Sequence, residues 1–169
     1  TAILMRTEYG QRVRIVVAPD EFKESLTAVS AARAMVLGWS AHAPTDEFDL
    51  CPLSDGGSGF VDTMHAALGG GLLDVVVTGP TGQPVPASIL RVGATAYVES
   101  AQACGLHLVD EADRDPTLTT TFGVGELIGA AIDAGVRRIV IGLGGSGTHD
   151  GGVGMLAALG AIADVDLTR

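Results

Sequence analysis

The stretch VRIVVAPDEFKESLTAVSAARAMVLGWSAH, Val13 to His42, decides the fold class of this chain. Its first residues, Val13 to Ala18, form a short, β-branched and nearly continuous apolar run, which is typical of a buried parallel strand. Pro19 ends that run, and a helix is predicted from about Thr27 to His42, with Thr27 as its N-cap. A strand followed by an amphipathic helix indicates the beginning of a parallel α/β sheet.

The residues that follow continue this pattern and then leave it. A strand is predicted over 48–53, a loop over 54–59 and a helix over 60–68, which together indicate a doubly wound, Rossmann-like sheet. After Gly71 the sequence predicts strands over 73–78, 85–92 and 95–99 around a turn-rich segment, typical of an antiparallel meander. A domain boundary is therefore expected near Gly71 to Thr78.

Helical structure is expected again over 121–134, followed by a strand over 138–143, a glycine-rich loop and a helix over 152–161. The predicted fold class is α/β throughout. Residues 1–74 contribute a partial Rossmann-like sheet, and residues 75–169 contribute a second α/β domain that begins with the meander.

Composition excludes several classes of protein. The 169 residues are 47% hydrophobic and 18% charged, as expected of a folded chain. The formal net charge of −10 argues against a nucleic-acid partner but not against ATP, which needs only local donors and a divalent cation. No apolar run approaches the ~18 residues of a membrane span, and the N-terminus has no signal-peptide pattern. Cys51 and Cys104 are predicted to be buried thiols, and we expect a cytoplasmic protein.

Three loops follow predicted strands, and each carries charged or small polar residues. The first, Ala18 to Ala28, contains Lys23, the only lysine among ten basic residues. Its ammonium group at the ligand-binding edge of a sheet suits a phosphate or carboxylate, and Asp20 suits a metal or the lysine itself. The alternative is an exposed loop in which Lys23 pairs with a neighbouring acid.

The second loop is PLSDGGSG, Pro52 to Gly59. Gly56 and Gly57 leave backbone N–H groups open to an anion, and the following helix presents its positive end. Asp55 suits a cation or a substrate hydroxyl. The alternative is a tight turn in which Asp55 only caps the helix.

The third loop is GLGGSGTHDGGVG, Gly142 to Gly154. It contains a G-x-G-x-x-G, but the helix does not open at the third glycine, so an NAD-binding oxidoreductase is the weakest functional hypothesis. We interpret it as an anion-binding loop, in which the donors are contributed by Gly144, Gly145, Ser146 and Thr148. Asp150 suits Mg²⁺ or a substrate hydroxyl. The alternative is a glycine-rich connection packed against its own sheet. His149, Glu99 and the threonines 119–121 are weaker candidates, the last as helix caps.

Together these segments resemble the glycerate kinase family of bacteria. The resemblance rests on APDEFKESLTA (18–28), PLSDGGSG (52–59), VTGPTGQPV (77–85), VESAQACGL (98–106), TTTFGVGELI (119–128) and IGLGGSGTHDGGVGML (141–156). Each motif alone is weak, whereas the six in this order are specific.

The resemblance implies ATP-dependent phosphorylation of D-glycerate with Mg²⁺, by two α/β domains of which the first is discontinuous. Carried over by motif, Asp20 and Lys23 fall in the first signature, Asp55 to Gly57 in the second and Ser146 to Asp150 in the last. We predict that Lys23, Asp20 and Asp55 are catalytic and that Asp55 and Asp150 bind Mg²⁺. The residues predicted to bind phosphate or substrate are Gly56, Gly57, Gly144, Gly145, Ser146, Thr148 and Asp150. Family members are longer, so the chain is expected to be an N-terminal part, dimeric or paired with a C-terminal part. The alternatives are a non-catalytic remnant that binds glycerate or nucleotide, and one half of a split kinase.

Overall fold

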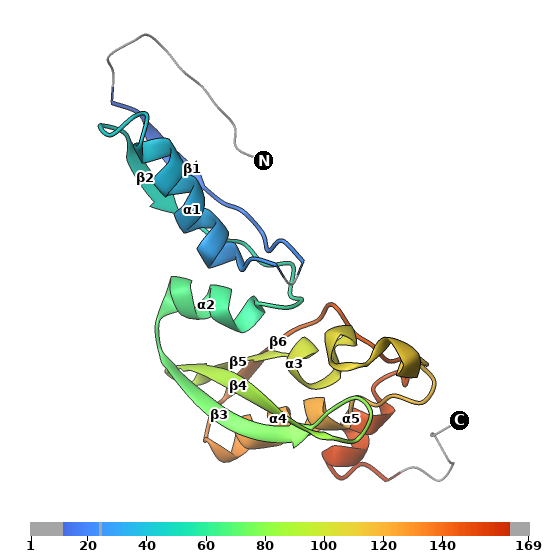
Figure 1. Ribbon diagram of the computed structural model, residues 1–169. Helices are drawn as coiled ribbons and strands as arrows, with labels where there is room; N and C mark the ends of the chain where they lie inside the picture. The colour runs from blue at the N-terminus through green and yellow to red at the C-terminus, as the bar shows by residue number, and fades with distance from the viewer. Residues whose placement is uncertain (1–11, 24, 163–169) are drawn as a thin grey trace. The chain divides into compact units, whose positions relative to one another are not determined.

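The computed structural model describes residues 12–23 and 25–162, which form two compact units divided in sequence between Ser54 and Asp55 (Figure 1). The division falls earlier than the boundary predicted near Gly71 to Thr78. The reason is that α2 (Phe60–Leu68) packs on strands β4 and β5 of the second unit, although it follows the first unit's pattern in sequence.

The first unit is a parallel strand pair with one connecting helix. β1 (Arg14–Val17) pairs with β2 (Glu47–Leu50), and α1 (Ala28–Ser40) connects them. Thr27 is the N-cap of α1, as predicted, and its hydroxyl accepts a hydrogen bond from Ser30 N at 3.2 Å.

The two faces of this strand pair differ. On one face, Phe48 packs edge to face against Trp39 of α1, with ring centroids 6.4 Å apart. The other face carries Val16, which is 60% exposed, and the ion pair between Arg14 and Asp49 at 2.7 Å. Parallel strands are normally covered on both faces, so this open face is unusual for the architecture.

The second unit is built on a four-stranded sheet with the order β3-β4-β5-β6. Its strands are β3 (Gly71–Thr78), β4 (Pro84–Val92), β5 (Thr95–Glu99) and β6 (Arg138–Gly142). β4 is antiparallel to both of its neighbours, β3 and β5, and β6 is parallel to β5. The unit also contains α2, α3 (Ala101–Cys104), η1 (Leu106–Leu108), η2 (Glu111–Asp113), α4 (Phe122–Asp133) and α5 (Val153–Ala158).

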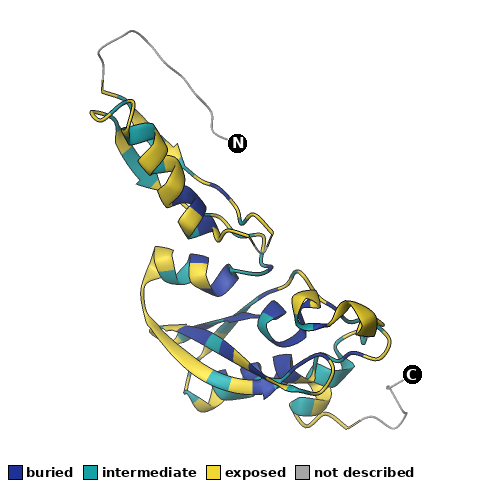
Figure 2. Ribbon diagram, viewed as in Figure 1, coloured by how far each residue is buried: buried dark blue, intermediate teal, exposed yellow. Residues whose placement is uncertain are grey.

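The sheet of the second unit buries side chains on both faces. Figure 2 colours the buried parts of its strands and helices dark blue. Ile89 and Val98 face α4 and form a core with Leu127 of that helix. Leu90 faces α2 and packs on Phe60. Successive strand residues point to opposite faces of the sheet. The odd or even position of a residue along its strand therefore decides which helix its side chain packs against.

The mixed α/β fold class is confirmed, and the predicted strands and longer helices are present with shifted ends. The strand predicted to reach Leu53 ends at Leu50, and the helix predicted over 152–161 covers only Val153–Ala158. The short helix α3 was not predicted. The expectation that both thiols are buried is wrong for Cys51, which follows the end of β2 and is exposed, whereas Cys104 is buried.

Candidate functional site

In the first unit, Asp20 and Lys23 lie in the loop that follows β1. The carbonyl oxygen of Phe22 accepts hydrogen bonds from Ser25 N at 3.0 Å and from the Ser25 hydroxyl, which closes a tight turn around Lys23. Lys23 is exposed, and its φ of 33° is the only positive φ of a non-glycine residue in the part of the chain that the structure describes. Such a conformation is sterically strained, and strain of this kind concentrates at functional sites. Asp20 is also exposed and accepts a hydrogen bond from Glu21 N at 2.8 Å.

In the second unit, the loop before α2 and the loop after β6 meet backbone to backbone. A Cβ on Gly142 would lie 2.6 Å from Gly56 O, and one on Gly144 would lie 2.7 Å from the Cα of Gly57. Real Cβ atoms do not approach backbone so closely. The contact between the two loops therefore requires glycine at both positions. Gly56, Gly57 and Gly144, which were predicted to bind phosphate, therefore pack the two loops together. Their contact with phosphate stays a prediction.

Asp55 begins the loop before α2. Its Oδ1 accepts a hydrogen bond from Gly57 N at 2.8 Å, which is the short local turn expected of an Asp-Gly sequence. The side chain is exposed. Asp55 is therefore held in a defined turn while its carboxylate remains at the surface.

Glu99 ends β5 and is 5% exposed. Its Oε1 accepts a hydrogen bond from Gly59 N at 3.2 Å, and its Oε2 accepts one from Val61 N at 3.1 Å. Gln102 Nε2 also donates to Oε2, at 3.4 Å. A carboxylate of the protein thus binds the positive end of α2, where the sequence analysis placed an external anion.

Asp150 lies between the first turns of α4 and α5. Its Oδ2 accepts hydrogen bonds from Thr121 N at 2.7 Å, from the Thr121 hydroxyl at 2.8 Å and from Gly154 N at 3.1 Å. Its Oδ1 accepts one from Gly152 N at 2.9 Å. Burial alone would raise the pKa of Asp150, but these hydrogen bonds outweigh it and lower the pKa below the ordinary value. The geometry favours a structural role for Asp150, and its assignment to Mg²⁺ stays a prediction.

The other predicted residues of the loop after β6 divide into two groups. The Thr148 hydroxyl donates to Thr119 O at 2.9 Å and accepts from Asp150 N at 3.2 Å, so it holds the loop together. Gly145, which has a φ of 63°, and Ser146 are exposed. Of the residues of this loop predicted to bind phosphate, these two are exposed to solvent and can be reached by a ligand. His149 is exposed as well, and its backbone N–H donates to Pro116 O at 2.9 Å.

No cluster of three or more His, Cys, Asp or Glu side chains suited to a metal ion occurs within residues 12–23 and 25–162.

The structural roles of Glu99 and Gln102 were missed by sequence reasoning. One signal for Glu99 was available: it directly follows an apolar strand and shares the parity of Tyr97, which lies on the face that meets α2.

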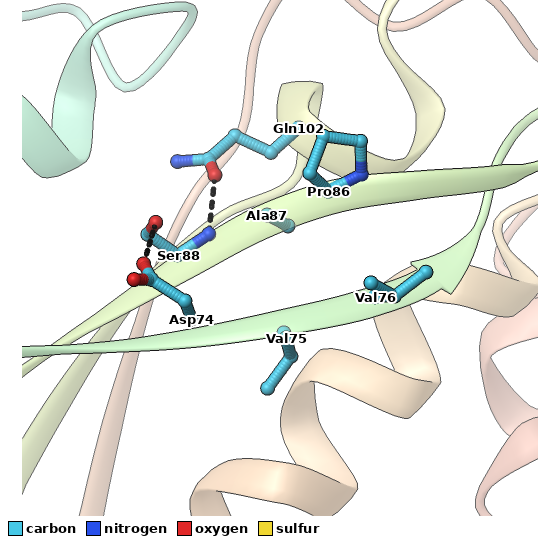
Figure 3. Close-up of a pocket in the computed structure, with 7 residues that line it drawn as sticks. All are labelled: Asp74, Val75, Val76, Pro86, Ala87, Ser88 and Gln102. Atoms are coloured by element: carbon cyan, nitrogen blue, oxygen red, sulfur yellow. Dashed lines mark hydrogen bonds between the residues drawn. The ribbon is translucent and has the colours of Figure 1, made fainter.

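A shallow depression of about 380 Å³ lies elsewhere in the second unit, on β3 and β4 (Figure 3). Gln102 reaches into it from α3 and accepts a hydrogen bond from Ser88 N at 2.7 Å, while the Ser88 hydroxyl bonds Asp74 at 2.6 Å (Figure 3). None of the predicted site residues lines it. Among the described helices, none combines the length and the hydrophobicity that crossing a bilayer requires.

Comparison with known proteins adds independent findings. The model of the glycerate kinase family matches residues 15–166. Glycerate kinase of Bacillus subtilis strain 168 is 49% identical over 150 residues, which cover 88% of this chain and 39% of that protein. Glycerate 2-kinase of Escherichia coli K12 is 47% identical over 151 residues, covering 88% and 40%. A crystal structure from Salmonella typhimurium LT2, provisionally named glycerate kinase 2, superposes with a TM-score of 0.72 at 46% identity and covers the same shares. The chain thus spans about 40% of the length of these relatives.

Proposed function

The chain belongs to the glycerate kinase family, and from this premise we propose that it forms the N-terminal part of an enzyme that phosphorylates D-glycerate with ATP. The observation that carries the proposal is the family match over residues 15–166, together with relatives named glycerate kinase at 46–49% identity. All six motifs lie within the matched range.

The proposed reaction forms a bond between a glycerate hydroxyl oxygen and the γ-phosphorus of ATP. It breaks the bond from that phosphorus to the ADP oxygen and releases the hydroxyl proton. We assign Lys23 the role of neutralising negative charge on the transferring phosphoryl group. Its exposure and its strained turn support this assignment. Asp20, in the same loop, is assigned to orienting the ammonium group of Lys23. Asp55 is assigned to the proton or to the metal, since its carboxylate is exposed and held by one local hydrogen bond.

Mg²⁺, when bound, would neutralise charge on the phosphates. It is usually held by one or two carboxylates, with water and phosphate oxygens completing its coordination. Asp55 fits this pattern, because a surface carboxylate leaves room for water and phosphate. Asp150 fits it less well, because both of its oxygens already accept hydrogen bonds from backbone N–H groups. Gly145 and Ser146 are the residues of the loop after β6 that we assign to phosphate.

A second candidate function is ligand binding without turnover by this chain alone. It is favoured by the fraction of the relatives that the chain spans, about 40%. Association with a further domain or with a second copy is supported by the open face of the first unit, where Val16 is exposed on a parallel strand pair. We therefore propose that phosphoryl transfer needs more of the polypeptide than residues 1–169.

The test is a binding and turnover experiment on residues 1–169. Calorimetric titration with MgATP and with D-glycerate measures binding, an ADP-release assay measures turnover, and size-exclusion chromatography gives the oligomeric state. We expect saturable binding of at least one ligand and no sustained glycerate-dependent ADP release. Lys23→Gln should weaken binding more than tenfold, or about 1.4 kcal/mol. The exposed Arg33→Gln is the matched control and should leave binding unchanged.

If neither MgATP nor D-glycerate binds the wild-type chain, the proposed function is contradicted. Robust turnover by a monomer would contradict the part of the proposal that requires more polypeptide. Turnover that appears only on addition of a separate C-terminal chain would favour a split enzyme.

A further inference from the structure

Glu99 is a buried acid for which the proposed reaction has no direct use. Its backbone lies at the end of β5, opposite Gly142 of β6. Strand parity directs its side chain to the same face as Tyr97, whose ring lies 6.3 Å from that of Phe60 in the first turn of α2. The position of Glu99 at the end of β5 therefore places its carboxylate beside the N-terminus of α2.

Within residues 12–23 and 25–162, Glu99 accepts hydrogen bonds from Gly59 N, Val61 N and the Gln102 amide, and none of these donors is cationic. An unpaired buried carboxylate is costly, so these donors and the dipole of α2 must compensate for its burial. The Gln102 amide is itself fixed, because its Oε1 accepts a hydrogen bond from Ser88 N at 2.7 Å. The orientation of Glu99 is therefore determined from two sides.

The loop from Asp55 to Gly59 is held at three successive points. Its start is closed by the bond from Gly57 N to the Asp55 carboxylate. Its middle rests on the backbone of Gly142 and Gly144. Its end, Gly59, donates to Glu99. Only the last of these three restraints depends on a charged side chain outside the loop.

We propose that Glu99 is a positioning residue: by binding the backbone N–H groups of Gly59 and Val61, it fixes the loop in the conformation in which Asp55 faces solvent. The inference about the loop rests on geometry alone. Its consequence for ligand binding rests on the proposed function, in which Asp55 serves the phosphoryl donor or acceptor.

The experiment uses the 169-residue chain and the variant Glu99→Gln, which keeps the side-chain volume but turns one acceptor oxygen into a donor. The matched control is Glu126→Gln, because Glu126 also accepts a backbone hydrogen bond, from Thr78 N at 2.6 Å, outside the loop. Amide hydrogen exchange is read at Gly57, Gly59 and Val61, and affinity is measured for MgATP and for D-glycerate.

We expect Glu99→Gln to accelerate exchange at all three amides at least tenfold and to weaken binding at least fivefold. Glu126→Gln should do neither, even where it lowers the thermal midpoint as much. In a double-mutant cycle, Glu99→Gln and Asp55→Asn should be non-additive for binding, because the first acts through the second. Glu99→Asp, whose shorter side chain retains the charge, should partly restore exchange protection and affinity.

Unchanged exchange at Gly57 in Glu99→Gln would overturn the inference. The inference would also be overturned if the wild-type chain binds ligand and Glu99→Gln exchanges faster but binds with unchanged affinity. Glu99 would then be a helix cap only. Faster exchange in a chain that binds neither ligand would sustain the positioning of Asp55 and contradict the proposed function instead. If Glu99→Gln does not fold, the comparison of Glu99→Asp with wild type decides by the same criteria.

Discussion

The Asp150→Asn substitution removes one charge and leaves the shape of the side chain nearly unchanged. An amide offers a single acceptor oxygen. If that oxygen keeps the bonds from Thr121 and Gly154, the NH₂ group is placed against the N–H of Gly152, and two donors then face each other. A hydrogen bond to a charged group contributes about 1.5–3 kcal/mol and a neutral one about 0.5–1.5 kcal/mol. One lost bond and the weakening of the others predict a destabilisation of about 2–4 kcal/mol.

The pH dependence has a defined sign. The pKa of Asp150 is lowered in the folded protein from its ordinary value of 3.8, so its stabilising effect is fully present above that value. The effect is lost as the pH falls through the lowered folded-state pKa. The difference in unfolding free energy between wild type and Asp150→Asn should therefore be constant near neutral pH and shrink below pH 3.8.

Urea denaturation at neutral and acidic pH measures these free energies, and hydrogen exchange at Thr121 and Gly154 localises the loss. Asp55→Asn is the matched control. Its carboxylate is exposed and accepts a hydrogen bond from Gly57 N, so less than about 1 kcal/mol is expected. Equal stability of wild type and Asp150→Asn at neutral pH would refute the structural role of Asp150. It would favour the prediction that Asp150 binds Mg²⁺.

Four further substitutions have expected outcomes. Lys23→Gly should relieve the strain of the positive φ and stabilise the fold by about 1 kcal/mol, measured as a slightly higher melting temperature. The same substitution should weaken ligand binding tenfold in calorimetry. A lower melting temperature would contradict the strained turn. Gly123→Ala should destabilise by about 1–3 kcal/mol in urea titrations, because a Cβ there meets Thr78 O, whereas Gly129→Ala in the same helix has open space and should stabilise by about 0.5–1 kcal/mol. Thr27→Ala should cost about 1 kcal/mol of unfolding free energy through the lost N-cap.

The order of strands and helices could be predicted from the sequence because it depends on local patterns. The apolar run that became β1, the N-cap at Thr27 and the helix over 60–68 are each determined by a few neighbouring residues. The unit division could not be predicted in the same way. It depends on α2 packing against β4 and β5, which come later in the sequence, and no local pattern records that contact.

The candidate site was only partly predictable for the same reason. The acidic residues and glycines of the loops were identified from their types and from their place after strands. Their partners depend on tertiary contacts: Glu99 of β5 accepts a hydrogen bond from Val61 of α2, and Asp150 accepts one from Thr121 at the start of α4. Sequence reasoning assigned glycine-rich loops to external anions, whereas in the fold two of the helix N-termini bind carboxylates of the protein itself.

The central claim is that the loops of this chain bind the substrates of a glycerate kinase. A ¹⁵N chemical-shift titration of residues 1–169 with MgATP and with D-glycerate tests it most directly. The account predicts saturable shifts in residues 20–23, in the loop 55–59 and around Gly145 and Ser146, weakened in Lys23→Gln but not in Arg33→Gln. The absence of saturable shifts with both ligands, or shifts confined to the depression on β3 and β4, would contradict it.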